Sequence, residues 1–462
     1  MLTFAAFFET HIQISFIMYL KSLFYSAFLS VLVTTTLSAQ HDNHAIPHAD
    51  TTHATSAQPH ATESVAHGDN HAADAHGHDA CAPAHDTSGK YDPVPNIMHH
   101  IGDAHQFEII PNIFTLPLPV FAYETEGGLT AGMSSMFHHG EKAVNGFVLA
   151  HDVVKKAIGL PKGEVALEVV HTDEEGHAHY SFMKEEDENG KKVENHYVRA
   201  AGQCYKLEEG RGLTNLKSSW IDFSITKNVF TMILSLGLLA FVFFKVANFY
   251  KNNKGKAPSG LTNMMEVFVT FIRDDVAKPS IGPKYEKYMS LLMSLFFFIL
   301  VNNLLGLIPV FPGSSNVTGN ISVTIVLALV VFLVTTFSGN KNYWQHIFWM
   351  PGVPTFVKVL MAPIEIASLF IKPFTLLIRL FANVTAGHVI ILTLVSLIFI
   401  FGNAGKSLGG SITGMAIAIP FVAFMNLLEL LVAFLQAFIF TLLSALYIGA
   451  AVEEHHHDEA HH

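Results

Sequence analysis

The hydrophobic residues of this chain are concentrated in its second half. Residues 226–450 are dominated by Leu, Ile, Val and Phe, whereas residues 41–215 are largely polar. In the second half the apolar residues form five stretches, at about 226–249, 289–311, 321–338, 355–401 and 421–452. Because about 20 apolar residues span the hydrocarbon core of a bilayer, this pattern predicts an all-α polytopic membrane protein with five membrane-embedded helices.

The last two stretches are too long for ordinary spans. Residues 355–401 contain Pro363 and Pro373, which we expect to break the helix. Residues 421–452 contain no proline, and as one helix these 32 residues would extend about 48 Å against about 30 Å of hydrocarbon. We therefore expect two long helices that are steeply inclined or bent within the membrane, and such helices need a partner to cover them.

The distribution of basic residues predicts the orientation in the membrane. Residues 245–287 hold eight Lys and Arg, while residues 312–320 hold none. The positive-inside rule places the first loop in the cytoplasm, with the N-terminal region outside and the C-terminus in the cytoplasm. A short interfacial helix is expected in the basic loop. Five apolar residues there share one helical face: Met264, Val267, Phe268, Phe271 and Ile272.

The N-terminus has the features of a secretory signal. Residues 18–39 combine a basic residue, Lys21, with an apolar stretch to about Leu37 and the small residues Ser38 and Ala39. Cleavage after Ala39 fits this pattern, and a retained membrane anchor is the alternative. Residues 1–17 would then be an upstream extension of the signal.

Residues 40–106 read as a His-rich linker. Residues 41–90 alone hold ten histidines and few residues that could form a core. Such a composition predicts a disordered, exported linker. Clustered imidazoles also bind zinc or copper, which is the alternative, but the spacings are irregular and no acidic or thiol ligand set recurs.

Residues 107–217 predict a small exported insert that is rich in β-structure. EVALEVVH and KKVENHYVRA alternate apolar and polar residues, and the polar segment KEEDENG between them is typical of a turn. The chain has two cysteines, Cys81 and Cys204, both in the polar half. They could form one disulfide if that half is exported.

Composition agrees with this division. Half of the residues are hydrophobic and only 14% are charged, whereas about a quarter are charged in soluble domains. The net charge of −11 therefore describes the exterior segments and not the membrane half.

A few polar side chains interrupt the two long apolar stretches. Ionisable groups at membrane depth are costly and usually face a water-filled path or a partner. The groups that stand out in this way are Glu365, Lys372, Arg379, Asn383, His388, Glu429 and Gln436.

These residues combine a permanent cation with titratable groups. Arg379 and Asn383 are four residues apart and share a helix face, whereas His388, nine residues from Arg379, points to the opposite side. Glu429 and Gln436 are seven apart and also share a face. Arginine keeps its proton at accessible pH, so it can repel protons and attract a carboxylate. His and Glu can exchange protons, which suits an aqueous access route.

Most of these residues also have a structural explanation. Lys372 can snorkel toward an interface, and Glu365 can cap a helix or pair locally. Asn383 and Gln436 can form interhelical hydrogen bonds. Arg379 has no acid near it in sequence, so a structural role explains it least well.

The motifs in this half resemble those of ATP synthase subunit a. KPFTLLIRLFANVTAGH (372–388) is similar to the signature of that family, an Arg followed by Leu-Phe, a small residue and Asn. LQAFIFTLLSALYIGAAVEEH (435–455) is similar to its last helix and C-terminus. FILVNNLLGLIPVFPG (298–313) and NISVTIVLAL (320–329) match in character and order, so the resemblance covers roughly residues 220–455.

The resemblance implies a proton-translocating stator subunit with two half-channels against the c-ring. Arg379 would face the ionised carboxylate of each passing ring subunit, with Asn383 and Gln436 as polar neighbours. Glu429 and His388 would belong to the exterior half-channel, and Glu365 would line the cytoplasmic one. The c-ring, subunit b of the peripheral stalk, the F1 ATPase and the lipid bilayer are the partners that the resemblance implies, in a bacterial inner membrane.

The His/Glu pair departs from the commonest bacterial pattern of the family. That pattern has an acid directly after Ala-Gly, where this chain has His388, and a histidine seven residues before the Gln, where it has Glu429. The two residue types are exchanged, and we interpret this as a compensated swap. Which of the two titrates near working pH stays open.

The resemblance and the composition together divide the chain into five parts. They are a signal (1–39), a His-rich linker (40–106), a β-rich insert (107–217), a subunit a-like membrane domain (220–452) and a cytoplasmic tail (453–462). A stand-alone ion-coupled transporter is the main alternative, although no internal repeat is evident. An exported metal-binding protein with an anchor is a second, but it does not explain Arg379 at depth.

No nucleotide, metal, cofactor or nucleic-acid site is expected. GNAGKSLGG (402–410) is the nearest match to a phosphate-binding loop. The position five residues before Gly405 is Ile400 and not the required Gly. The chain is therefore not expected to be an enzyme on its own.

Overall fold

The computed structural model describes most of the chain from residue 102 onward. The described residues are 97, 102–110, 114–125, 127–150, 152–168, 171–172, 178–179, 181–186, 192–211, 218–253, 255–308, 315–349, 354–402 and 407–453. All of them belong to one compact unit, which includes residues 80–462. The predicted signal, the histidines of residues 41–90 and Cys81 lie outside the described residues.

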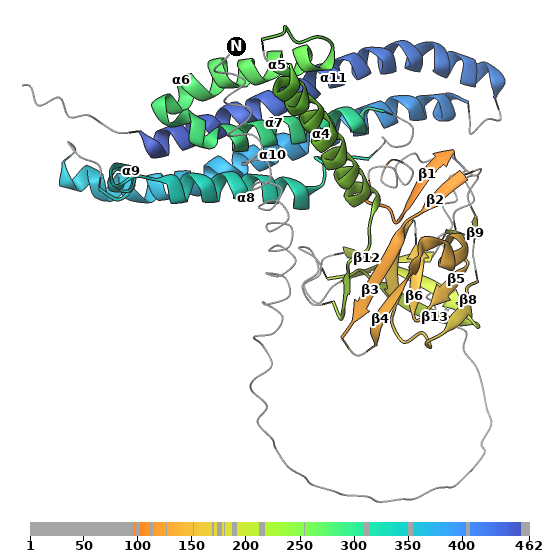
Figure 1. Cartoon of the computed structure of the whole chain (residues 1–462). Coiled ribbons are helices and arrows are strands. Elements are labelled where there is room, and N and C mark those ends of the chain that lie inside the picture. The colour runs from red at the N-terminus through yellow and green to blue at the C-terminus, as the bar shows by residue number, and fades with distance from the viewer. Residues whose placement is uncertain are drawn as a thin grey trace, which may run out of the picture. The chain divides into compact units, whose positions relative to one another are not determined.

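The polar half of the described chain forms β-structure (Figure 1). Its largest sheet has seven strands in the order β11-β12-β13-β7-β6-β5-β8. These strands are Ser181–Glu186 (β11), Lys192–Ala200 (β12), Gln203–Glu208 (β13), Val153–Ala157 (β7), Phe147–Ala150 (β6), Lys142–Val144 (β5) and Glu164–Ala166 (β8). The prediction of a β-rich region is confirmed, although three residues of the expected turn KEEDENG belong to β11.

Three smaller sheets accompany it. One has three strands in the order β14-β3-β4, namely Trp220–Asp222, Pro119–Glu124 and Gly128–Met133. The others are two-stranded: β1 (Gln106–Ile110) with β2 (Phe114–Pro117), and β9 (His171–Thr172) with β10 (Ala178–His179). A 3-10 turn, Ser134–Gly140, follows β4.

Two apolar clusters form the core of the β-structure. In one, Trp220 packs edge-on against Phe147, with ring centroids 5.0 Å apart, and both side chains are almost fully buried. The other cluster centres on Val148, Val198 and Leu207. Cys204, in β13, is disulfide-bonded.

Among the described residues, five helices are long and apolar enough to cross a membrane, as predicted. They are Lys227–Asn252, Leu261–Gly306, Ile321–Ser338, Thr355–Phe401 and Leu408–Val452. The first, third, fourth and fifth are α4, α8, α10 and α11. The second is a composite of α5 (Leu261–Phe271), a π-turn (Ile272–Ala277), α6 (Lys278–Ile281), a 3-10 turn (Gly282–Lys284) and α7 (Tyr285–Gly306). A short helix, α9 (Lys341–Phe348), follows α8.

Prolines do not end the long helices where the sequence suggested. Pro363 and Pro373 lie inside one continuous α10 of 47 residues, and Pro420 lies inside α11, which begins at Leu408 instead of Phe421. A proline removes one helical hydrogen bond, and neighbouring helices can compensate for that loss within a membrane. At 1.5 Å per residue the two helices are each about 70 Å long.

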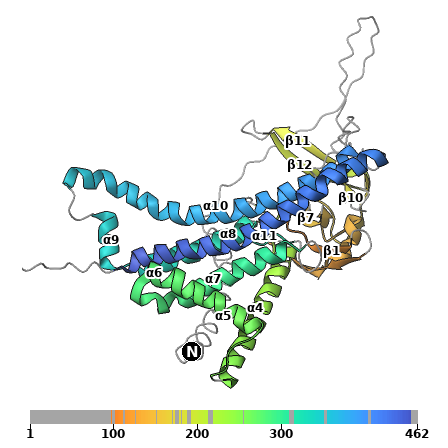
Figure 2. The ribbon, with the colours of Figure 1, turned by 90° about the horizontal axis from the view of Figure 1, so that it is seen from above.

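Helices α10 and α11 run antiparallel and pack along each other (Figure 2). Glycines allow a close approach where the hairpin turns. A Cβ on Gly414 would lie 2.9 Å from Cα of Ile398. In the most apolar 18-residue segment of each of these two helices, only 11% is buried inside the protein, compared with 78% in the corresponding segment of the span that contains α7. Much of the apolar surface of α10 and α11 therefore needs cover from lipid or a partner.

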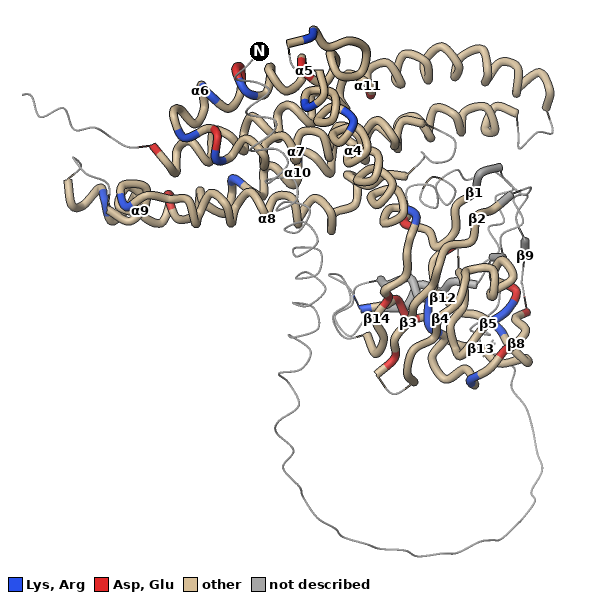
Figure 3. Tube along the Cα trace, viewed as in Figure 1, with Lys and Arg blue, Asp and Glu red and all other residues tan. Residues whose placement is uncertain are grey.

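The helix predicted in the basic loop exists as α5, but its apolar residues do not all share one environment. Met264 and Val267 are exposed, whereas Phe268 packs near Phe296 and Phe434, and Ile272 is fully buried. Figure 3, a backbone trace coloured by residue type, shows Lys and Arg positions around α5 and α6 and long uncharged stretches along α10 and α11.

Candidate functional site

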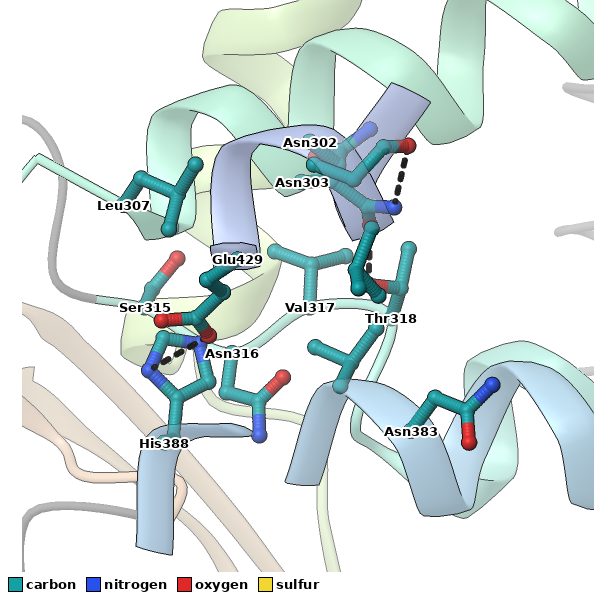
Figure 4. Close-up of a pocket in the computed structure, with 14 residues that line it drawn as sticks. Asn302, Asn303, Leu307, Ser315, Asn316, Val317, Thr318, Asn383, His388 and Glu429 are labelled. Carbon is teal, nitrogen blue, oxygen red and sulfur yellow. Dashed lines mark hydrogen bonds and ion pairs between the residues drawn. The ribbon is translucent and has the colours of Figure 1, made fainter. Parts of the chain in front are cut away.

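The two titratable residues that the sequence predicted as a pair lie together. His388 on α10 and Glu429 on α11 approach to 3.8 Å between Nδ1 and Oε1 (Figure 4). Their side chains are 21% and 10% exposed. The antiparallel packing of the two long helices brings these residues, 41 positions apart in sequence, to one site.

Two glycines allow this approach. A Cβ on Gly387 would lie 2.9 Å from Oε1 of Glu429, and a Cβ on Gly306 would lie 3.6 Å from Nε2 of His388. A larger residue at 387 would therefore crowd Glu429, whereas one at 306 would crowd the backbone oxygen of Ser315, 3.1 Å from its Cβ, and would meet His388 at an ordinary van der Waals distance. The site depends on small residues as well as on the titratable pair.

His388 and Glu429 line a small polar cavity. It holds about 20 Å³ of space for the centres of water molecules, and about 10–15 Å³ is enough for one ordered water. Its polar lining comes from α7, α10, α11 and the turn that precedes α8. The polar residues are Asn302, Asn303, Ser315, Asn316, Thr318, Asn383, His388 and Glu429.

Several polar atoms of this lining are buried without a hydrogen-bond partner. They are Oε2 of Glu429, Oδ1 of Asn302, Oγ of Ser315 and Nδ2 of Asn316. Buried polar atoms are almost always satisfied, by protein or by ordered water. Four such atoms around one cavity indicate that water fills it.

Asn303 holds the wall of the cavity in place. Its Nδ2 donates to the carbonyl oxygen of Ala433 at 3.3 Å, and its Oδ1 accepts from the hydroxyl of Thr318 at 2.5 Å. Asn303 thus joins α7, α11 and the turn that leads into α8. Asn302 and Asn303 were not among the site residues predicted from the sequence, although two amides inside the apolar stretch FILVNNLLGLIP were a visible signal.

Arg379 is half-buried and lines neither this cavity nor the one described next. It makes no ion pair or hydrogen bond with any residue in the described part of the chain. Asn383, one turn along α10, is exposed and lines the cavity, while Gln436 on α11 is buried. The structure thus brings Asn383, His388 and Glu429 together and leaves Arg379 apart.

A second cavity of similar size lies around Lys372. It is lined by α8, α9, α10 and α11, including Thr335, Tyr343, Lys372 and Tyr447. Nζ of Lys372 lies 5.7 Å from the ring centroid of Tyr447, a cation–π contact. Oγ1 of Thr335 is buried without a partner.

Glu365 lies about two turns before Lys372 on α10. Its carboxylate accepts from the hydroxyl of Ser368 at 3.5 Å, and it acts electrostatically on Tyr343, which lines the second cavity. Among the described residues, no three His, Cys, Asp or Glu side chains form a group that could hold a metal ion.

A buried polar junction connects the β-structure to α4. The carboxylate of Asp103 accepts from the hydroxyl of Thr226 at 2.9 Å and from the N–H of Asn228 at 3.0 Å. Burial raises the pKa of Asp103 despite these hydrogen bonds. Nearby, Nε2 of His105 lies 2.8 Å from Oδ2 of Asp222. Burial alone would raise the pKa of Asp222, but the hydrogen bond and charge of His105, together with Ser224, lower it.

Together, these features define a polytopic membrane protein with one polar cavity, a second cavity that is lined mainly by apolar groups, and an arginine that no described side chain neutralises. A family model described as "ATP synthase A chain" matches residues 229–449. A second model, for a domain of unknown function, matches residues 96–176.

Curated relatives agree with the first match. ATP synthase subunit a of Chloroherpeton thalassium is 45% identical over 256 residues, which cover 54% of this chain and 73% of the relative. The protein of the same name from Chlorobium phaeobacteroides (strain BS1) is 47% identical over 248 residues, covering 52% and 70%. The one from Myxococcus xanthus is 37% identical over 276 residues, covering 58% and 86%. The chain belongs to the ATP synthase subunit a family.

Proposed function

We propose that this chain is the proton-translocating stator subunit of a rotary F-type ATP synthase, and that it provides two separate half-channels for protons. Its relatives are named as subunit a of ATP synthase. Family membership supports a non-catalytic role in the membrane part of that complex. The c-ring, the peripheral stalk and, through the stalk, the F1 ATPase are the partners that this role requires.

One observation carries the proposal: two small cavities occur at different positions along α10, one lined by many polar side chains and one mainly apolar with Lys372 in its wall, and Arg379 lies between them in sequence. The first includes His388 and the second includes Lys372. At 1.5 Å per residue, Arg379 is about 10 Å along the helix from Lys372 and about 14 Å from His388. Two access routes with a fixed cation between them are what separate half-channels require.

The exterior half-channel would use the first cavity. A proton enters past Glu429 and His388, helped by water held at the partnerless atoms of the lining. Glu429 and His388 can each take up and release a proton, so they can hand it along the route. The proton then neutralises an ionised carboxylate on the c-ring, and rotation carries that subunit away.

The cytoplasmic half-channel would use the second cavity. The returning carboxylate would release its proton into the route past Lys372 and Tyr447. Glu365 would belong to the same route, because it acts electrostatically on Tyr343 of that cavity. Lys372 is included because its ammonium group is held over the Tyr447 ring inside the cavity. A purely snorkelling lysine would not need this contact.

Arg379 would separate the two routes. Its guanidinium has no partner among the described residues, so it is available to the ionised carboxylate that arrives from the ring. As a permanent cation it repels protons and prevents a direct leak between the cavities. Each charge that crosses the membrane gains about 2.3 kcal/mol per 100 mV, so several protons must contribute to each ATP.

The c-ring is the partner that would cover the exposed faces of α10 and α11, of whose most apolar windows only 11% is buried. The basic loop supports a cytoplasmic side around α5 and α6. The C-terminal end of α11 packs against α6, where a Cβ on Gly449 would meet the carbonyl oxygen of Ser280. The C-terminus would therefore lie on the cytoplasmic side and the β-structure on the exterior side.

A side-specific blocking experiment tests the two routes. Asn316→Cys places a thiol in the first cavity and Thr335→Cys places one in the second. Membrane-impermeant thiol reagents are added to right-side-out and to inverted vesicles, and ATP-driven proton pumping is then measured with the reagent inside or outside. The unsubstituted chain, in which Cys204 is disulfide-bonded, is the control.

We expect the Asn316→Cys variant to be inhibited from the exterior and the Thr335→Cys variant from the cytoplasm. Inhibition of both variants from one side would contradict two half-channels and favour a single continuous path, as in a transporter.

A further inference from the structure

An exposed face of the sheet β14-β3-β4 is composed of apolar side chains. The opposite face packs into the β-core through Val120, Ala122 and Trp220. Strand alternation then sends the intervening residues outward. The outward residues, including the segment that continues β14, are Pro119, Phe121, Tyr123, Leu129, Ala131, Met133, Ile221, Phe223 and Ile225.

This face, which we call the apolar sheet face, carries no Lys, Arg, Asp or Glu. Its five largest exposed side chains are between 37% and 62% exposed: Phe121, Tyr123, Leu129, Met133 and Phe223. An antiparallel sheet with one solvated face normally presents polar residues on that face. A contiguous apolar face therefore indicates an interaction surface.

Strand register orders the face into three rows that approach α4. Tyr123 pairs with both Ile221 and Leu129 in the outermost row. In the middle row Phe121 pairs with Ala131 and its carbonyl accepts from the N–H of Phe223 at 2.8 Å.

In the row nearest the membrane helix, Pro119 pairs with Met133 and accepts from the N–H of Ile225 at 2.9 Å. Ile225 is two residues before Lys227, where α4 begins. Each strand residue adds about 3.3 Å, so the nearest row lies within about 7 Å of the start of α4, along the chain. The headgroup layer on each side of the hydrocarbon is about 5–7 Å thick, which places this row at membrane level.

The connection between sheet and helix is held by direct contacts. The N–H of Lys227 donates to the carbonyl oxygen of Ala104 at 2.8 Å, and Asp103 accepts from Thr226 and Asn228. Phe107 packs edge-on against Phe230, with ring centroids 6.2 Å apart. The sheet therefore cannot move freely away from the point where α4 enters the bilayer.

We propose that the apolar sheet face rests on the surface of the lipid bilayer, with its aromatic side chains in the headgroup layer. The face is continuous with a membrane-spanning helix, which favours lipid over a separate protein as its occupant. Tyr123 and the two phenylalanines suit this zone, because an aromatic ring buries apolar area near the acyl chains and the Tyr hydroxyl stays hydrated. The lack of charge indicates contact through apolar area and not through attraction to anionic lipids.

Depth-dependent quenching tests the proposal in the assembled, reconstituted complex. Leu129→Cys and Met133→Cys place a thiol on the apolar sheet face, and Lys162→Cys places one at an exposed position between β7 and β8. Each thiol is labelled with an environment-sensitive fluorophore. The unsubstituted chain is labelled in parallel to measure the background.

Fluorescence is then compared with lipids that carry a nitroxide near the headgroup and with iodide in the water. We expect nitroxide lipids to reduce the emission at positions 129 and 133 but not at 162, and iodide to reduce it at 162 more than at the other two. Iodide quenching at all three positions would overturn the proposal, because the face would be in water. Protection of positions 129 and 133 from both quenchers would also overturn it, since a protein partner or a second copy would then cover the face.

Discussion

Exchanging His388 and Glu429 is the sharpest test of the first cavity. The family's commonest order is the reverse of the one found here, and in the structure Nδ1 of His388 and Oε1 of Glu429 are 3.8 Å apart. His388→Glu alone would leave two carboxyl groups in one small site. His388→Glu combined with Glu429→His restores one imidazole and one carboxyl at the same separation.

The size of the effect follows from that distance. Two unit charges about 4 Å apart interact by about 4 kcal/mol at an effective dielectric constant of about 20. The single variant therefore introduces a repulsion of that order between two ionised carboxylates, or keeps one carboxyl protonated and unable to take up another proton. Either outcome removes a proton relay, and about 4 kcal/mol corresponds to about three orders of magnitude in rate.

The assay is ATP-driven acidification of inverted membrane vesicles, normalised to the amount of assembled complex. We expect pumping to be abolished in His388→Glu and largely recovered in the double variant. A double variant that pumps no better than the single one would refute the idea that the two residues form an exchangeable pair. Near-normal pumping by His388→Glu would refute the relay itself.

Three further predictions concern packing and pH. Gly387→Ala would bring a Cβ to 2.9 Å from Oε1 of Glu429. Because the flexible Glu429 side chain can give way, we expect reduced proton pumping with a loss of less than about 1 kcal/mol in the free energy of unfolding. A larger loss of stability beside the reduced pumping would contradict this. Gly449→Ala would drive a Cβ into the backbone oxygen of Ser280, so we expect a destabilisation of about 1–3 kcal/mol and less assembled complex. Gly237→Ala, whose Cβ meets nothing within 4 Å, should leave both unchanged. The lowered pKa of Asp222 means that its pairing with His105 contributes stability above about pH 4, and that this stability is lost as the pH falls through the lowered pKa. The unfolding temperature, followed by Trp fluorescence, should therefore fall less steeply below about pH 4 in Asp222→Asn than in the unsubstituted chain. Parallel curves of unfolding temperature against pH would contradict the assignment.

The five spans could be predicted because a bilayer imposes a strong and local rule on the sequence. About 20 apolar residues must occur together, and this signal does not depend on distant contacts. The ends of the long helices were predicted less well. The apolar stretch at 421–452 predicted a helix start at Phe421, yet α11 begins at Leu408 and contains Pro420. Packing against α10 stabilises this part of the helix, from which proline removes only one hydrogen bond.

The candidate site was predictable in part. His388 and Glu429 stood out because ionisable groups are rare at membrane depth, and the structure places them together. The amides Asn302, Asn303 and Asn316 could not be assigned to the same cavity from sequence. Their convergence depends on how α7, the turn before α8 and α11 pack, and such contacts between distant segments leave no periodic signal.

The apolar sheet face illustrates the same limit. Alternation predicted β-strands in residues 107–217, but β14 lies beyond that range and pairs with β3 about 100 residues earlier. Only this pairing aligns Phe121, Tyr123 and Phe223 on one face. Register between distant strands is set by tertiary packing, so the face was not visible in the sequence.

The measurement that tests the central claim most directly is passive proton leak in vesicles that carry Arg379→Ala, measured beside ATP-driven pumping and the amount of assembled complex. Arg379→Lys, which keeps the charge but not the planar guanidinium, is the matched control. The account predicts that Arg379→Ala assembles, does not pump and leaks protons as fast as or faster than the unsubstituted complex, because the two cavities lose the cation between them. Near-normal coupled pumping by Arg379→Ala would contradict it.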